Sequence, residues 1–123
     1  GIGCRRDKDP AELAQQVDRV LAQYQIAPES IYKIASIDLK THERAICQLA
    51  ETWKVPFVTF SAETLLQVPG AYALSEFVKQ TTGVGNVCER AAVAALEEQK
   101  RKNPKWICRK QAGNGVTVAL LET

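Results

Sequence analysis

The first six residues, Gly-Ile-Gly-Cys-Arg-Arg, combine flexible glycines with two guanidinium groups. Glycine lets backbone N–H groups approach an anion, and arginine binds carboxylates or phosphates through two parallel hydrogen bonds. A helix is expected shortly afterwards, and its N-terminal N–H groups would favour the same anion. The segment therefore predicts ligand-binding roles for Gly3, Cys4, Arg5 and Arg6. The alternative is a tight turn with two solvated arginines.

A second polar segment, Ser-Ile-Asp-Leu-Lys at residues 36–40, ends an expected strand. In open α/β sheets, ligands bind at the edge where the carboxyl ends of parallel strands meet. Asp38 and Lys40 there could orient a substrate or place a proton, and Ser36 would lie at the same edge. The alternative is that Asp38 or Thr41 caps the next helix and that Lys40 is solvated.

A second glycine-rich segment, Thr-Thr-Gly-Val-Gly-Asn-Val-Cys-Glu-Arg at residues 81–90, precedes another expected helix. Gly83 and Gly85 would leave backbone N–H groups open to an anion at that helix N-terminus. Glu89 falls in the first helical turn, where a carboxylate also interacts favourably with the helix dipole. Both a binding role and a purely structural role are open for this segment.

Three further residues complete the candidate set. Ser75 and Glu76 stand at the start of another expected helix, where capping is the alternative role, and Lys110 precedes a hairpin loop and could face a ligand or water. The sequence lacks a Ser-His-Asp set, a Walker A segment and metal-ligand spacing. The dinucleotide pattern Gly-x-Gly-x-x-Gly is not met, because residue 6 is arginine. These residues favour an anionic small ligand without naming it.

Length and composition are those of one globular domain: 123 residues, 46% hydrophobic and 24% charged. A formal net charge of +2 is too even for general nucleic-acid binding. No apolar segment approaches the roughly 20 residues that cross a membrane, and no signal peptide is visible. A cytoplasmic protein is expected, with Cys4, Cys47, Cys88 and Cys108 as reduced thiols. The wide cysteine spacing and the single histidine, His42, argue against a metal site.

Hydrophobic periodicity predicts alternating strands and helices. Asp9 suits a helix N-cap and Pro10 the first helical position. The expected elements are a helix at 10–24, a strand at 31–37, a helix at 42–53, a strand at 55–60, a short helix capped by Ser61 and ending at Leu66, helices at 74–81 and 87–100, and a hairpin of strands 106–110 and 116–122 around the loop 111–115.

This alternation predicts an α/β domain with a mixed, mostly parallel sheet, to which the C-terminal β-hairpin adds an antiparallel edge. The chain opens on Gly-Ile-Gly, which has the character of a strand end. Residues 1–123 are therefore expected to form a single domain whose first strand begins upstream of Gly1.

Taken together and in this order, the segments resemble the CbiG C-terminal domain and CobE family of cobalamin biosynthesis. The resemblance covers essentially the whole chain. It is carried by Gly-Ile-Gly-Cys-Arg-Arg, Ser-Ile-Asp-Leu-Lys-Thr-His-Glu, Thr-Gly-Val-Gly-Asn-Val-Cys-Glu-Arg-Ala-Ala-Val, and a lysine followed by Gly-Asn-Gly-Val-Thr-Val-Ala. It implies a three-layer α/β/α sandwich with a mixed sheet. Asp7 departs from the family pattern, which usually has glycine after the arginines.

The resemblance also implies a reaction. CbiG proteins similar to this chain are cobalt-precorrin-5A hydrolases, which open a lactone on the contracted macrocycle and release acetaldehyde. CobE proteins are short relatives in the aerobic route. Cobalt would enter only as part of a bound corrinoid, and no protein cofactor is implied. CbiG hydrolases carry an additional N-terminal region, and the domain occurs fused to other pathway enzymes, so a fused domain or partner enzyme is implied.

A precorrin is a ring fringed with carboxylates, which basic side chains at one sheet edge would suit. The basic candidates are Arg5, Arg6, Lys40 and Lys110. The candidates for activating water on a lactone are Ser36, Asp38, Glu76 and Glu89. Two other classes stay open: a nucleotide- or phosphate-binding module, and a non-catalytic domain that presents precursors to a partner enzyme.

Overall fold

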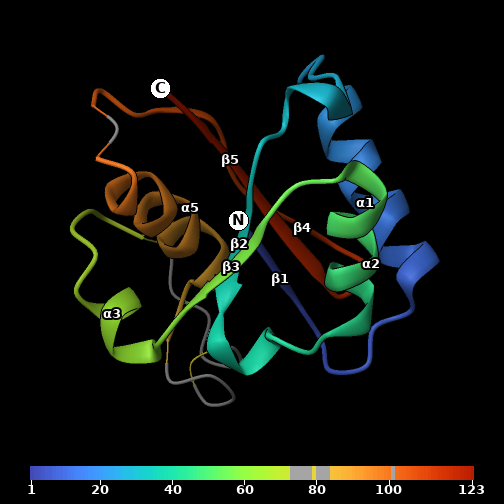
Figure 1. Cartoon of the computed structure of the whole chain (residues 1–123), viewed down its shortest axis with the longest axis horizontal. Coiled ribbons are helices and arrows are strands. Elements are labelled where there is room, and N and C mark those ends of the chain that lie inside the picture. The colour runs from blue at the N-terminus through green and yellow to red at the C-terminus, as the bar shows by residue number, and fades with distance from the viewer. Residues whose placement is uncertain (73–78, 80–83, 101) are drawn as a thin grey trace.

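The computed structural model describes every residue except 73–78, 80–83 and 101 (Figure 1). The expected helix at 74–81 lies almost wholly outside the described residues. Within them, strands and helices alternate over residues 2–66, and the chain ends in two consecutive strands. In order they are β1 (Ile2–Cys4), α1 (Pro10–Gln23), the 3₁₀ turn η1 (Pro28–Ser30), β2 (Ile34–Ile37), the 3₁₀ turn η2 (Asp38–Lys40), α2 (Arg44–Trp53), β3 (Phe57–Phe60), α3 (Ala62–Leu66), α5 (Val87–Glu98), β4 (Lys105–Gly113) and β5 (Val116–Glu122).

Helices cover the strands from both sides (Figure 1). On one side α1 packs against α2, and Leu13, Val17 and Ile46 are buried between these helices and the strands. On the other side α3 packs against α5, with Leu65 and Val84 fully buried in a second apolar cluster. The amphipathic stripes expected from the sequence therefore bury against opposite sides of the strands.

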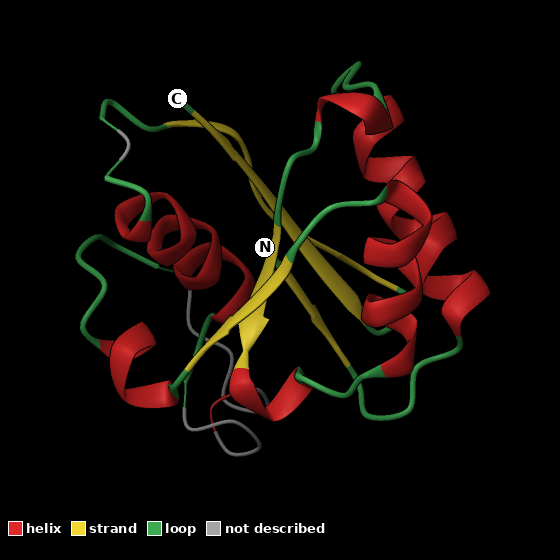
Figure 2. Ribbon diagram, in the orientation of Figure 1, coloured by secondary structure: helices red, strands yellow, loops and turns green. Residues whose placement is uncertain are grey.

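The described strands pair in two sets (Figure 2). Strands β2 and β3 pair in parallel, from Ile34 opposite Phe57 to Ile37 opposite Phe60. Strand β5 pairs antiparallel with both β1 and β4, in the order β1-β5-β4. The expectation of a mostly parallel sheet is wrong for these strands, whereas the parallel pair and the antiparallel hairpin are confirmed. The reason is that β5 lies directly against β1, so the hairpin supplies an internal strand as well as an edge.

A buried hydroxyl links the two sets of strands. Ser36 of β2 is fully buried, and its Oγ donates a 2.7 Å hydrogen bond to the carbonyl of Ile2 in β1. Strands β1 and β2 also lie in contact. The end of β1, and with it the loop that carries the two arginines, is thereby held beside the end of β2.

The C-terminal hairpin is tighter than expected. Its loop was expected to span residues 111–115, but β4 continues to Gly113 and only Asn114 and Gly115 turn the chain. Both have positive φ, 53° and 73°. This is the backbone shape that lets a two-residue turn follow the twist of the flanking strands, and Asn-Gly adopts it readily.

Local signals set most helix starts. Asp9 caps α1 as predicted, because its Oδ2 accepts a hydrogen bond from the N–H of Glu12. Ser61 caps α3 in the same way, through the N–H of Thr64. Helix α2 starts at Arg44 rather than near residue 42, because η2 occupies the preceding turn. None of the described helices is long and apolar enough to span a membrane.

Helix α2 ends at a position whose backbone conformation favours glycine. Lys54 is its C-cap, with φ 56° and ψ 45° in the left-handed region, and it is exposed. A Cβ is unfavourable in that conformation. We therefore expect Lys54→Gly to have a free energy of unfolding roughly 0.5–1 kcal/mol above that of Lys54→Ala. Urea denaturation of both variants measures the difference, and an alanine variant as stable as the glycine variant would contradict the assignment of strain.

Candidate functional site

A cavity of about 1030 Å³ opens where the loop after β1 meets the N-terminal end of α5, turn η2 and the β4–β5 hairpin. Each of these segments comes from a different part of the chain. The structure brings together at its wall most of the residues predicted to bind a ligand: Gly3, Cys4, Arg5, Arg6, Lys40, Gly85 and Lys110.

The turn between β4 and β5 holds the start of the loop that joins β1 to α1. This loop, residues 5–9, is called the arginine loop below. The backbone N–H of Arg5 donates a 3.0 Å hydrogen bond to the carbonyl of Gly115. A Cβ on Gly115 would lie 3.1 Å from the Arg5 side chain, in addition to requiring φ +73°, and a Cβ on Gly3 would lie 2.7 Å from the Thr117 hydroxyl. Glycine at these two positions therefore lets strand β1 and its loop approach the hairpin closely.

The carboxylate of Glu43 holds the other end of the same loop. It is buried and accepts hydrogen bonds from the backbone N–H groups of Asp7 (3.3 Å) and Lys8 (3.1 Å). The ammonium of Lys40 lies 3.6 Å from the same carboxylate, and both side chains are less than a tenth exposed. Lys40 is thus a buried, paired cation in the cavity wall and differs from the solvated lysine of the alternative interpretation.

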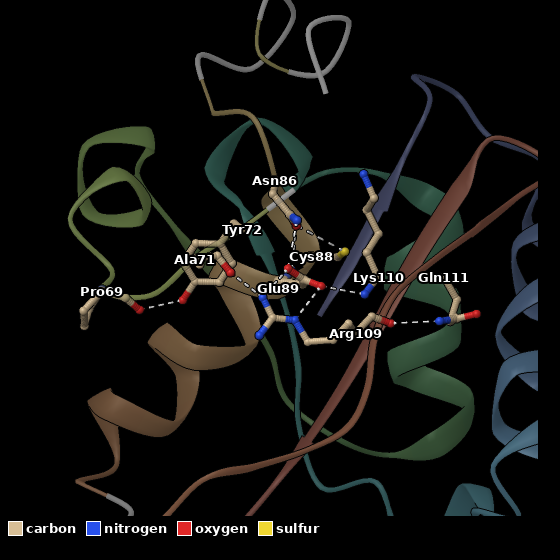
Figure 3. A network of polar contacts seen from close by, with 9 residues as sticks. All are labelled: Pro69, Ala71, Tyr72, Asn86, Cys88, Glu89, Arg109, Lys110 and Gln111. Carbon is tan, nitrogen blue, oxygen red and sulfur yellow. Dashed lines mark hydrogen bonds and ion pairs between the residues drawn. The ribbon is translucent and has the colours of Figure 1, made fainter. Parts of the chain in front are cut away.

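Three other cations lie at the cavity. Arg5 and Arg6 are exposed, and the Arg6 side chain is 93% accessible and lies 3.8 Å from the equally exposed carboxylate of Asp7. Lys110 is half-buried, and its ammonium extends away from the Glu89 carboxylate (Figure 3). The cavity wall therefore carries more positive than negative side chains among the described residues.

Glu89 joins helix α5 to strand β4 (Figure 3). Its side chain is 3% exposed and accepts hydrogen bonds from the Arg109 guanidinium (3.1 and 3.2 Å), the backbone N–H of Lys110 (2.7 Å) and the side-chain amide of Asn86 (2.9 Å). Asn86 in turn caps α5 by accepting from the N–H of Glu89. A carboxylate so fully bonded acts as a structural anchor, and Glu89 does not line the cavity.

The same guanidinium belongs to an aromatic stack. Arg109 lies 4.7 Å from the ring centre of Trp106 and 5.7 Å from that of Tyr72, and it donates a hydrogen bond to the carbonyl of Ala71. Arg90 covers the Tyr72 ring at 4.5 Å. These cation–π contacts hold the segment after α3 against α5 and β4. Both α5 and β4 contribute residues to the cavity wall.

Two predicted site residues take other positions. Ser36 is fully buried and bonded to Ile2, so it aligns strands and does not line the cavity. Asp38 is exposed in η2 and also lies outside the cavity lining, and its backbone carbonyl accepts the Thr41 N–H and hydroxyl. Neither Asp38 nor Thr41 caps α2, whose N-cap is Glu43. Ser75, Glu76 and Gly83 fall outside the described residues.

The two cysteines at the cavity are neutral thiols. Burial raises the pKa of Cys4 to about 11 and, likewise, that of Cys88 to about 11. A thiol must lose its proton to act as a nucleophile or metal ligand, so neither is activated at neutral pH. All four cysteines are unpaired. Among the described residues, no three His, Cys, Asp or Glu side chains gather as a metal-binding group.

Sequence reasoning missed Glu43, Asn86 and the turn glycine Gly115 as parts of the site. Asn86 and Glu89 have the spacing of a capping box, a residue pattern visible before α5 that predicts the local bond. Glu43 carries no comparable signal, because its partners Asp7 and Lys8 lie 36 and 35 residues away.

Residues 1–121 match the protein family described as the C-terminus of cobalamin synthesis protein G. The chain belongs to this family. As a member of the CbiG C-terminal family, it is 41% identical over 92 residues to the cobalt-precorrin-5A hydrolase of Salmonella typhimurium, a stretch that is 75% of this chain and 26% of that protein. It is 34% identical over 94 residues to CobE of a Sinorhizobium species, covering 76% of this chain and 61% of that protein.

The fold of this CbiG C-terminal domain is also that of a solved relative. The crystal structure of CobE, a protein from the cobalamin (vitamin B12) biosynthetic pathway, superposes with a TM-score of 0.87 at 26% identity, covering 100% of this chain and 90% of CobE. The chain spans only about a quarter of the Salmonella hydrolase. The family and the pathway, cobalamin biosynthesis, therefore agree with the resemblance stated from the sequence motifs.

The anchoring role of Glu89 predicts a loss of stability on neutralisation. In Glu89→Gln, an NH₂ donor replaces one carboxylate oxygen and faces the donors of Arg109 or Lys110. We expect the free energy of unfolding to fall by roughly 1–3 kcal/mol. The fall should lie toward the lower value of this range, because the half-exposed Arg109 is screened by solvent. Glu98→Gln, an exposed change on the same helix, should stay within about 0.5 kcal/mol of the parent. Equal stability of the two variants would contradict the anchor.

The raised pKa of Cys4 predicts slow alkylation. With a pKa of about 11, roughly one Cys4 thiol in a thousand is ionised at pH 8, because the pKa exceeds the pH by three units. The rate of iodoacetamide labelling of Cys4, followed by peptide mass spectrometry, should rise about tenfold per pH unit from pH 7 to pH 10. In the urea-unfolded chain it should level off near pH 9. A plateau below pH 9 in the folded protein would overturn the assignment.

Proposed function

We propose that this domain binds a precorrin-type tetrapyrrole in the cavity beside the arginine loop. The observation that carries the proposal is the convergence of cationic side chains on one cavity: Arg5 and Arg6 from the loop after β1, Lys40 from η2 and Lys110 from β4. Carboxylate side chains around a macrocycle would meet these charges through charge-assisted hydrogen bonds.

The apolar part of the cavity wall suits the ring itself. Ile37, Leu39, Val87 and Val116 line the cavity between the cations. Leu39 is 62% exposed in η2, although large apolar side chains are usually buried. A ring of low polarity with an acidic fringe matches a wall that combines apolar side chains with cations. The volume, about 1030 Å³, is at the upper end of small-molecule sites.

We assign binding rather than turnover to the described part of the domain. Opening a lactone requires that water, activated by a base, add to the carbonyl carbon while the ring C–O bond breaks to give a carboxylate and a hydroxyl group. Glu43 is the one carboxylate among the described residues that line the cavity, and its oxygens are already bonded. Asp38 lies outside the lining, and Glu89 is fully bonded. The hydrolase name of the longer relatives fits a reaction completed with their additional residues.

The proposal is tested with two matched corrin probes. Cobyrinic acid carries carboxylate side chains, and cobinamide carries amides on the same ring. We expect the domain to bind cobyrinic acid more tightly in absorbance titrations, because only its side chains pair with the cations. Arg5→Ala combined with Lys110→Ala should weaken this binding roughly 10- to 100-fold and flatten its salt dependence. Acetaldehyde release from the domain with bound cobalt-precorrin-5A is followed in parallel, because the candidate base Glu76 lies outside the described residues.

The matched control removes two cations elsewhere. Lys102 and Lys105 are exposed and lie outside the cavity lining, so Lys102→Ala with Lys105→Ala changes net charge equally and should leave binding close to that of the parent. Equal loss in both double variants would show a non-specific charge effect. A preference for adenine nucleotides or inorganic phosphate over cobyrinic acid would favour the phosphate-binding class, and acetaldehyde release would place catalysis in this domain.

A further inference from the structure

The placement of Glu43 is not explained by its own helix. It occupies the N-cap of α2, where Ser, Thr, Asp or Asn would accept a hydrogen bond from the helix, yet its side chain makes no capping bond. It is instead buried against a loop far away in the sequence, with both oxygens on the N–H groups of Asp7 and Lys8. A buried carboxylate without a helix-capping task must act through the loop it holds.

The backbone of the arginine loop has a conformation that hydrogen bonds from outside the loop would stabilise. Asp7 has φ 56°, in the left-handed region, which aspartate adopts more readily than most side chains but less readily than glycine. It follows directly after Arg5 and Arg6, the exposed cations of the cavity. The only side-chain contact recorded for the Arg6 guanidinium among the described residues is the long one to Asp7. The direction of Arg6 therefore depends on the backbone of the loop, which is bonded to Gly115 at Arg5 and to Glu43 at Asp7 and Lys8.

We infer that Glu43 is a positioning residue for ligand binding. It holds the backbone at residues 7 and 8 so that Arg5 and Arg6 face the cavity, and it fixes the Lys40 ammonium in the cavity wall through the 3.6 Å contact. This inference rests on the proposed function, because it assigns to Glu43 a part in binding the same carboxylate-fringed ring. Glu43 makes no contact with the ligand in this role.

The positioning role predicts a change in ligand affinity opposite to the one that charge alone predicts. Glu43 is an anion in a cationic cavity wall, so by charge alone its neutralisation should tighten the binding of a polyanion. If Glu43 acts by positioning, neutralisation should weaken that binding, because the loop and Lys40 lose their common anchor. Charge and position thus predict opposite changes for one substitution.

The experiment compares Glu43→Gln with the parent in two readouts. The first is amide hydrogen exchange at Asp7 and Lys8, which reports the loop without any ligand. The second is the affinity for cobyrinic acid. We expect faster exchange at both amides and affinity reduced roughly tenfold, the loss expected when charge-assisted bonds are no longer held in place. Urea denaturation of the variant checks that it is folded at the temperature of the titration.

Two further variants control for charge and for folding. Glu12→Gln removes a carboxylate that pairs at 2.7 Å with the Lys8 side chain but accepts no backbone N–H of the loop, so its affinity should match the parent or slightly exceed it. Glu43→Asp keeps the charge on a side chain one methylene shorter. It should weaken binding as Glu43→Gln does, because the shorter side chain cannot reach the loop, and it serves in place of Glu43→Gln should that variant unfold.

The outcomes separate the two proposals. If the parent binds cobyrinic acid and both Glu43 variants bind it as tightly or more tightly, the positioning role is wrong and the proposed function stands. If the parent itself does not bind, the proposed function fails and the role of Glu43 in binding fails with it. Weaker binding by both Glu43 variants, with Glu12→Gln unchanged, supports the inference.

Discussion

One buried carboxylate, that of Glu89, determines how the two ends of the candidate site meet. It receives donors from helix α5 on one side and from strand β4 on the other, including the backbone N–H of Lys110 at 2.7 Å. A charge held at 3% exposure is tolerated only when its acceptor sites are bonded. The N-terminal end of α5 is thereby fixed beside β4, and the cavity forms between them and the arginine loop. These bonds therefore add to the packing of α5 against β2 and β5 in holding two walls of the site together.

The second carboxylate of the site, Glu43, works by the same physics on the opposite wall. Both groups collect backbone N–H donors from segments distant in sequence, and both pair with a cation, Arg109 for Glu89 and Lys40 for Glu43. Their negative charges are thus compensated by cations and N–H donors of the protein itself. Three cations that line the cavity, Arg5, Arg6 and Lys110, come from the loop and the strand that these anchors hold. The cavity proposed to bind a polyanion can in this way contain carboxylates without repelling that ligand.

The strand arrangement explains why the loop after β1 is so close to the hairpin. Strand β5 lies between β1 and β4, so the Asn114-Gly115 turn comes to rest against Arg5. Had the hairpin formed only an edge, as the strand–helix alternation indicates, this turn would lie away from the arginines. The insertion of β5 therefore supplies both a central strand and one wall of the cavity. The superposition on CobE, with a TM-score of 0.87, places the same fold in a relative of the cobalamin pathway.

Features that depend on residues close together in the chain could be predicted from the sequence alone. Asp9 and Ser61 predict the helix starts that they cap, and the apolar stripes predict the buried helix faces, because these interactions span at most a few helical turns. The order of the motifs also identified the family, since a motif is recognised from its residues and spacing without the arrangement of the loops in space. Three features became visible only in the folded chain: β5 pairs with β1, Glu89 anchors a strand, and Glu43 holds a loop 35 and 36 residues away. Pairings of that kind depend on which distant segments pack together, and no local propensity or spacing encodes the contact of a buried carboxylate with a backbone N–H far along the chain.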